Sequence, residues 1–99
     1  DTAYHELFKS LSGENIEIAI VPIGAYNPWK KNHCNPEEAL IMANDHIGAK
    51  YFIPIHTKTF KQGSEPIDEP LTWLNKSVVN YDIKLGLDDI GKTFTLPNL

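Results

Sequence analysis

Apolar residues in two short parts of the chain follow the patterns expected of β-strands. In residues 15–23, isoleucine recurs at every second position before the pattern becomes continuously apolar. Residues 51–55 are an unbroken run of aromatic and aliphatic side chains, and the chain turns polar directly after His56. Both patterns predict strands, the second of them buried. A brief third strand is predicted at residues 93–96.

Three other segments have the periodicity and end signals of helices. The clearest is residues 36–47, where Asn35 can accept hydrogen bonds from first-turn amides, a proline occupies the first helical position and Gly48 ends the pattern. Shorter apolar stripes predict helices over residues 5–11 and from about residue 68 to Val78.

Helices and strands therefore alternate along the chain, which is typical of an α/β layer with helices packed on a sheet. Two or three strands make a poor free-standing sheet. We therefore expect one face of the sheet to expose apolar side chains, or to be covered by another part of the protein or by another chain. The chain begins at Asp1 without an initiator methionine, so we expect residues 1–99 to be a single partial domain of a longer protein.

Composition narrows the classes of function. The net charge of -4 argues against a nucleic-acid-binding surface, which needs clustered lysine and arginine. No apolar stretch approaches the length of a membrane span. The single cysteine, Cys34, cannot form an internal disulfide and fits a reducing compartment. We expect a cytoplasmic location, with peripheral attachment to a membrane as the alternative.

Asp1, His33 and His56 are the candidate site residues. His56 leaves the buried strand at the place where a cleft at the sheet edge would lie, and a rigidly held imidazole there suits catalysis or metal binding. The same position also suits a histidine that only hydrogen-bonds to the backbone. His33 precedes the capped helix, and Asp1 precedes a helix and a strand, so the three residues can converge on one edge. A carboxylate with imidazoles suits zinc.

Other motifs are weaker. The chain contains no closely spaced histidine or cysteine metal motif, no nucleophile elbow and no glycine-rich phosphate loop. A nucleophilic thiol at Cys34 is not favoured, because no neighbouring residue obviously lowers its pKa. His5 and His46 lie on predicted helices, and we interpret both as packed or exposed side chains without a catalytic role.

Five segments of the chain together resemble a known family. They are DTAY at 1–4, PIGAY at 22–26, HCNPEEA at 33–39, IHTKTF at 55–60 and DEP at 68–70. In this order they are similar to the C-terminal half of metallo-β-lactamase-fold hydrolases, closest to the branch that contains N-acylphosphatidylethanolamine-hydrolysing phospholipase D. The resemblance extends from Asp1 to about Val78.

The resemblance implies an αββα sandwich with two divalent metal ions, zinc in particular, at the sheet edge. It implies that Asp1 bridges the metals, that His56 binds one of them and that His33 lies beside the site and contacts substrate. A metal-bridging hydroxide would then attack a small-molecule or lipid phosphodiester.

The chain also departs from the family pattern. The family usually has Trp-Gly after the strand-end histidine, where this chain has Thr57-Lys58, so the wall of the cleft is expected to be more polar. The remaining metal ligands belong to the N-terminal half, so this chain alone is expected to be inactive and metal-poor. Two alternatives stay open: a lactonase-type member of the same superfamily, and a non-catalytic α/β module that binds a partner through Tyr26 and Trp29.

Overall fold

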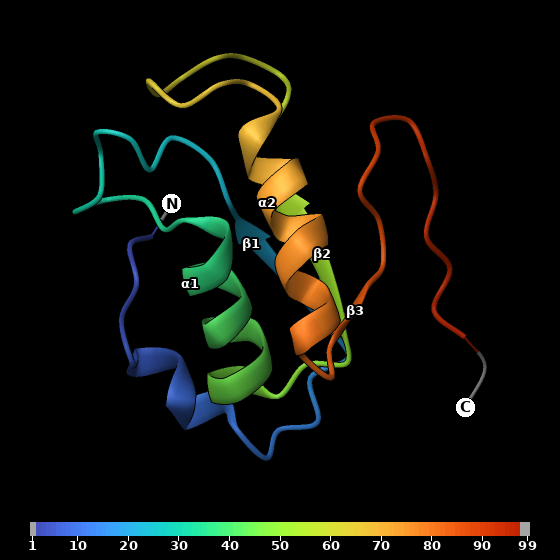
Figure 1. The fold of residues 1–99 in the computed structure, drawn as a ribbon. Helices are drawn as coiled ribbons and strands as arrows, with labels where there is room; N and C mark the ends of the chain where they lie inside the picture. Colours follow the sequence, from blue (N-terminus) through green and yellow to red (C-terminus); the bar gives the residue numbers. More distant parts are fainter. Residues whose placement is uncertain (1, 98–99) are drawn as a thin grey trace.

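The computed structural model describes residues 2–97 as a small α/β domain built on a three-stranded sheet (Figure 1). The strands β1 (Ile18–Pro22), β2 (Tyr51–Ile55) and β3 (Lys84–Leu85) are parallel and lie in the order β1-β2-β3. Parallel strands need long crossover connections, and helices supply both of them here. The carboxyl ends of β1 and β2 consequently lie at the same edge of the sheet.

The first crossover contains the helix predicted from the Asn35 cap. The Asn35 side chain accepts a hydrogen bond from the Glu38 amide at 2.8 Å, and the Glu38 carboxylate accepts one from the Asn35 amide at 2.9 Å. This reciprocal pair is a capping box, so the prediction is confirmed. The helix α1 (Pro36–Leu40) continues into a π-helical segment, η2 (Ile41–Ile47), which ends at Gly48 with a φ of 75°.

The other predicted helices form with altered bounds. The helix α2 (Glu69–Ser77) continues into a short 3₁₀ turn, η3 (Val78–Asn80). The N-terminal helix is a single 3₁₀ segment, η1 (Leu7–Leu11), rather than an α-helix over residues 5–11. No helix among residues 2–97 has the length and apolar character needed to cross a membrane.

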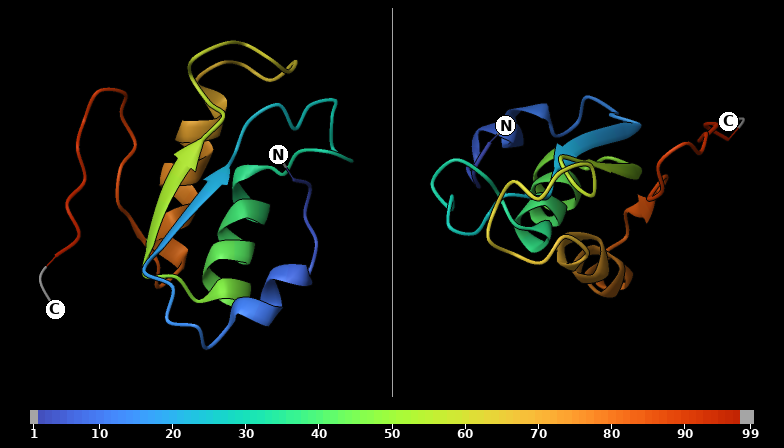
Figure 2. Two further views of the ribbon diagram at one scale, coloured as in Figure 1. Left: turned by 180° about the vertical axis from the view of Figure 1, so that it is seen from behind. Right: turned by 90° about the horizontal axis from the view of Figure 1, so that it is seen from above.

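Both α1 and α2 lie against one face of the sheet (Figure 2). The largest fully buried side chains fill the space between the two layers: Phe52, Ile23, Leu40, Met42 and Leu74. The hydroxyl of Tyr81 donates to Glu37 at 2.7 Å and ties α1 to the segment after α2.

The opposite face of the sheet is partly open. Ile20 on β1 is 59% exposed and Ile55 on β2 is 46% exposed. Alternation along each strand puts them on the face away from the helices. The expectation that one face of the sheet would expose apolar side chains is therefore confirmed.

The predicted strand at residues 93–96 is wrong, and the third strand is Lys84–Leu85 instead. Lys84 and Gly86 donate backbone hydrogen bonds to the carbonyls of Lys50 and Phe52, so they occupy the edge of β2. Phe94 packs its ring against Tyr51, with ring centroids 5.0 Å apart. The apolar residue that suggested a strand is thus used for side-chain packing.

Replacing Asn35 with alanine removes the acceptor for the Glu38 amide. We expect Asn35→Ala to lower the free energy of unfolding by about 1 kcal/mol, measured by urea denaturation. Asn35→Ser, which keeps a capping oxygen, should lose only a few tenths of a kcal/mol. Equal losses for the two variants would show that the cap does not stabilise the helix.

Candidate functional site

His33 and His56 lie together at the carboxyl edge of the sheet. Their rings are stacked, with centroids 5.1 Å apart and planes inclined by 23°. His56 directly follows β2, and His33 stands three residues before the first residue of α1, so the first crossover brings them together. The predicted convergence is confirmed for these two residues. Asp1, the third candidate, lies outside the described residues.

The backbone at this edge adopts conformations that are rare for residues with side chains. Ala25, His56 and Lys58 have φ angles of 64°, 62° and 64°. Such left-handed conformations cost about 1–3 kcal/mol each and persist only where surrounding contacts hold them. Because these residues cluster around the histidine pair, contacts with the rest of the structure, and not local conformational preference alone, hold the backbone there.

Gly24 allows the ends of β1 and β2 to approach one another. A Cβ atom at Gly24 would lie 2.1 Å from the carbonyl oxygen of His56. The amide of Ile23 also donates to the Ile55 carbonyl at 3.0 Å. The backbone of His56 is thus packed directly on that of Gly24, and only glycine fits there.

Glu65 fixes the loop that follows β1. Its side chain is buried, and its two carboxylate oxygens accept hydrogen bonds from the amides of Ala25 at 2.8 Å and Asn27 at 2.9 Å. Glu69 accepts a hydrogen bond from the Tyr26 hydroxyl at 2.5 Å. Burial and this hydrogen bond raise the pKa of the Tyr26 phenol, so the hydroxyl keeps its proton.

The surroundings of His33 favour the neutral form of its imidazole. Burial, and next the charge of His56, lower the pKa of His33 below its ordinary value. A neutral imidazole has one donor and one acceptor nitrogen. In its neutral form His33 therefore has one nitrogen of each kind.

Cys34, next to His33, is not a reactive thiol. Its side chain is fully buried, and Sγ donates to the Pro22 carbonyl at 3.2 Å. Burial, reinforced by the carboxylate of Glu38, raises the pKa of the thiol to about 11. The structure therefore gives no support to a nucleophilic role for Cys34, which the sequence did not favour either.

The described residues do not by themselves make a metal site. Within residues 2–97, no three histidine, cysteine, aspartate or glutamate side chains come together as a metal-binding group. His33 and His56 offer two imidazoles, whereas zinc takes three or four protein ligands. The Glu65 carboxylate already accepts two amide hydrogen bonds. The two-metal centre implied by the resemblance does not fit these residues alone.

A groove of about 340 Å³ adjoins His56. Its lining combines apolar side chains such as Ile53, Ile55 and Leu71 with charged side chains of both signs, among them Lys58 and Asp88. Lys58 is one of the two positions where the chain departs from the family pattern, and it lines this groove beside His56.

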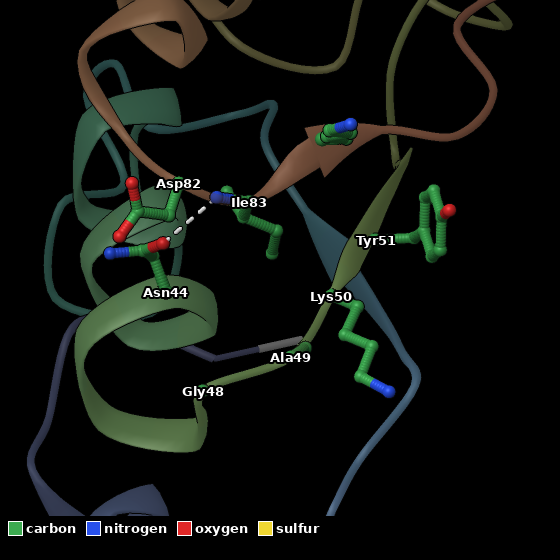
Figure 3. Close-up of a pocket in the computed structure, with 8 residues that line it drawn as sticks. Asn44, Gly48, Ala49, Lys50, Tyr51, Asp82 and Ile83 are labelled. Atoms are coloured by element: carbon green, nitrogen blue, oxygen red, sulfur yellow. Dashed lines mark hydrogen bonds between the residues drawn. The ribbon is translucent and has the colours of Figure 1, made fainter.

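A second pocket, of about 490 Å³, lies at the other end of β2 (Figure 3). Its lining includes Lys50, Tyr51 and Asp82, and the Asn44 side chain there accepts a hydrogen bond from the Ile83 amide at 3.0 Å. None of the sequence-predicted site residues lines this pocket.

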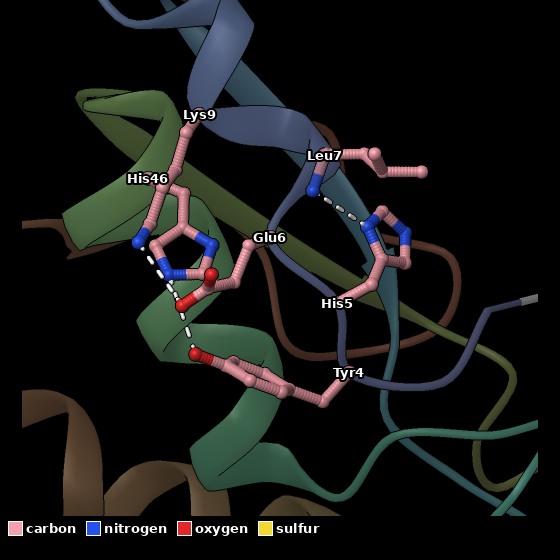
Figure 4. Close-up of polar contacts among 6 residues, drawn as sticks. All are labelled: Tyr4, His5, Glu6, Leu7, Lys9 and His46. Carbon is pink, nitrogen blue, oxygen red and sulfur yellow. Dashed lines mark hydrogen bonds and ion pairs between the residues drawn. The ribbon is translucent and has the colours of Figure 1, made fainter.

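The other two histidines, His5 and His46, make their contacts elsewhere and are not part of the His33–His56 pair. His46 is buried on η2, where its Nε2 lies 3.4 Å from the Tyr4 hydroxyl (Figure 4). His5 accepts a hydrogen bond from the Leu7 amide at 3.1 Å. The first contact ties the segment before η1 to η2, and the second is local to the start of η1, in agreement with a structural role for each histidine.

Sequence reasoning missed Glu65 as a residue of this edge. It lies in a turn region without apolar periodicity, and its partners Ala25 and Asn27 are about 40 residues earlier. The available signal was the pair of glutamates, Glu65 and Glu69, that flanks the start of a helix. That signal does not identify backbone amides as the partners.

No model of a known protein family matches the chain, and no curated protein matches it. The likeness to metallo-β-lactamase-fold hydrolases therefore stays a prediction from the five sequence segments. Any function assigned to the chain rests on its own residues and their geometry.

The raised pKa of Cys34 predicts slow alkylation of the folded chain. With a pKa of about 11 instead of 9.0, the thiolate fraction at pH 7.5 is about 100-fold lower than that of an ordinary thiol. Iodoacetamide labelling followed by mass spectrometry should be slower by at least this factor than labelling in urea. Equal rates in both states would contradict the buried, protonated thiol.

The close approach at Gly24 predicts a large cost for adding a methyl group. We expect Gly24→Ala to lower the free energy of unfolding by more than Gly13→Ala does, in urea denaturation. Gly13 has a φ of 88° and open space around it, so its substitution should cost only about 1–2 kcal/mol of backbone strain. A smaller loss at Gly24 than at Gly13 would contradict the tight junction.

Proposed function

We propose that this chain carries the His33–His56 part of the site of a metal-dependent hydrolase of the metallo-β-lactamase type, acting on a phosphodiester. The observation that carries the proposal is the stacked imidazole pair at the carboxyl edge of the parallel sheet. The two histidines come from two of the five segments that resemble the family. They meet in space although 23 positions separate them in the sequence.

The surroundings of the pair support a site rather than a packed core. Ligands of open α/β sheets bind outside the carboxyl ends of the strands. Left-handed residues cluster at functional sites, and Ala25 and His56 are both left-handed here. The adjoining groove offers apolar and charged surface together, which suits a substrate that has an ionic group and an apolar part.

Each residue has a role in this proposal. His56 would be a metal ligand, and His33 would exchange a hydrogen bond with a substrate oxygen. Lys58 would attract the negative charge of a phosphodiester. Asp1 would be the bridging ligand, and the remaining ligands would come from protein outside this chain, which would also cover the exposed isoleucines of the sheet.

The proposal is tested with the complete protein encoded by the gene, loaded with Zn²⁺ or Mn²⁺. Hydrolysis of bis(p-nitrophenyl) phosphate should be detectable and should exceed hydrolysis of a γ-lactone. We expect His56→Asn, whose side chain tolerates a left-handed backbone, to lower kcat/KM at least about 100-fold. His33→Ala should raise KM, and His5→Ala should leave both parameters within about twofold.

Three outcomes would contradict the proposal. Preferred hydrolysis of the lactone would assign the lactonase alternative, and absence of hydrolysis of either substrate would favour the non-catalytic module. Two tightly bound metal ions per isolated 99-residue chain, by elemental analysis, would show that the chain needs no further ligands. We expect the isolated chain to be inactive and metal-poor.

A further inference from the structure

We infer that Glu65 is a positioning residue, whose carboxylate fixes the loop between β1 and α1 and thereby holds His33 against His56. This loop comprises residues 23–35 and carries His33 near its end. The geometric claim stands without the proposed function, whereas any effect of Glu65 on hydrolysis rests on it.

The carboxylate is suited to this task by burial and by its partners. Glu65 is 6% exposed, and an ionised carboxylate in such a place is costly unless it is hydrogen-bonded. Its Oε2 and Oε1 atoms accept from the amides of Ala25 and Asn27, two residues apart on the same turn. Charge-assisted bonds of this kind are roughly twice as strong as neutral ones. Together they hold the left-handed conformation of Ala25.

The turn at Ala25 and Asn27, which Glu65 holds, lies between the backbone junction at His56 and the end of the loop at His33. On one side it follows Gly24, on which the His56 carbonyl is packed. On the other side, the amide of His33 donates to the Trp29 carbonyl at 3.0 Å, so the far end of the loop is internally closed. A displacement of Ala25 and Asn27 therefore moves the loop that carries one ring, relative to the strand end that carries the other.

The segment around Glu65 has little freedom to move away. The amide of Ser64 donates to the Asn27 carbonyl at 2.5 Å. A Cβ atom at Gly63 would lie 2.6 Å from the Asn27 carbonyl oxygen and 2.6 Å from Glu65 Oε1. The cavity that Glu65 and His56 line together has a volume of only about 10 Å³.

Glu69 provides a matched control. It comes four residues after Glu65 and carries the same side chain, but it accepts a hydrogen bond from the Tyr26 hydroxyl and not from a loop amide. Glu69→Gln changes the net charge by the same amount as Glu65→Gln. Only the latter removes the carboxylate shared by two backbone amides.

The experiment compares the two variants with the wild-type chain by NMR. In Glu65→Gln, we expect the hydrogen-exchange rates of the Ala25 and Asn27 amides to rise about 10- to 100-fold. The contact between the His33 and His56 rings, observed as a nuclear Overhauser effect, should be lost. Core amides such as that of Phe52 should keep their exchange rates, and Glu69→Gln should keep the ring contact.

A second variant keeps the carboxylate and disturbs its place. Gly63→Ala should reproduce the faster exchange of Ala25 and Asn27 and the loss of the ring contact. If Glu65→Gln does not fold, Gly63→Ala decides the question. If neither folds, the wild-type chain decides it, because rapid exchange of both amides in the native state would overturn the inference.

Two further results would also overturn it: an intact ring contact in Glu65→Gln, or equal loss of the contact in Glu69→Gln. These readouts need neither metal nor substrate. Loss of the ring contact in Glu65→Gln, with no hydrolysis by the complete protein, would therefore reject the proposed function and leave the role of Glu65 in place.

Discussion

The parallel pairing of β1 with β2 is the constraint on which the rest of this structure depends. It places the carboxyl ends of both strands at one edge, with Pro22 opposite Ile55 in the register. The chain must then cross back over the sheet, and α1 with η2 makes this crossing while burying Leu40 and Met42. The stacked histidines follow from this geometry, because one residue precedes the crossing helix and the other ends the second strand.

Local signals in the sequence were sufficient for the elements that local physics determines. The Asn35 cap and Gly48 predicted the ends of the crossing helix, and the apolar run predicted β2. Capping and burial both require particular residue types at these positions, so the sequence shows them directly. The meeting of His33 with His56 followed from the chain order of these elements.

Features that depend on distant partners could not be predicted. The two residues of β3 form a strand only because β2 offers them a free edge, and they have no apolar run of their own. The buried role of Glu65 depends on amides of Ala25 and Asn27, which become available only when the loop adopts a left-handed turn. The π-helical segment η2 likewise places Asn44 where its side chain accepts a hydrogen bond from the Ile83 amide, just before β3.

The register of the sheet has a consequence for how the chain folds. Ile18 pairs with Tyr51, and Tyr51 pairs with Lys84, so each strand meets a partner 33 residues away. Neither pairing can begin as a hairpin, and each must first close a long loop at an entropic cost. Folding of such non-local, parallel pairings is intrinsically slow. During synthesis, β1, the first crossover and β2 can assemble before α2 has left the ribosome, so the histidine edge can form first and the strand β3 last.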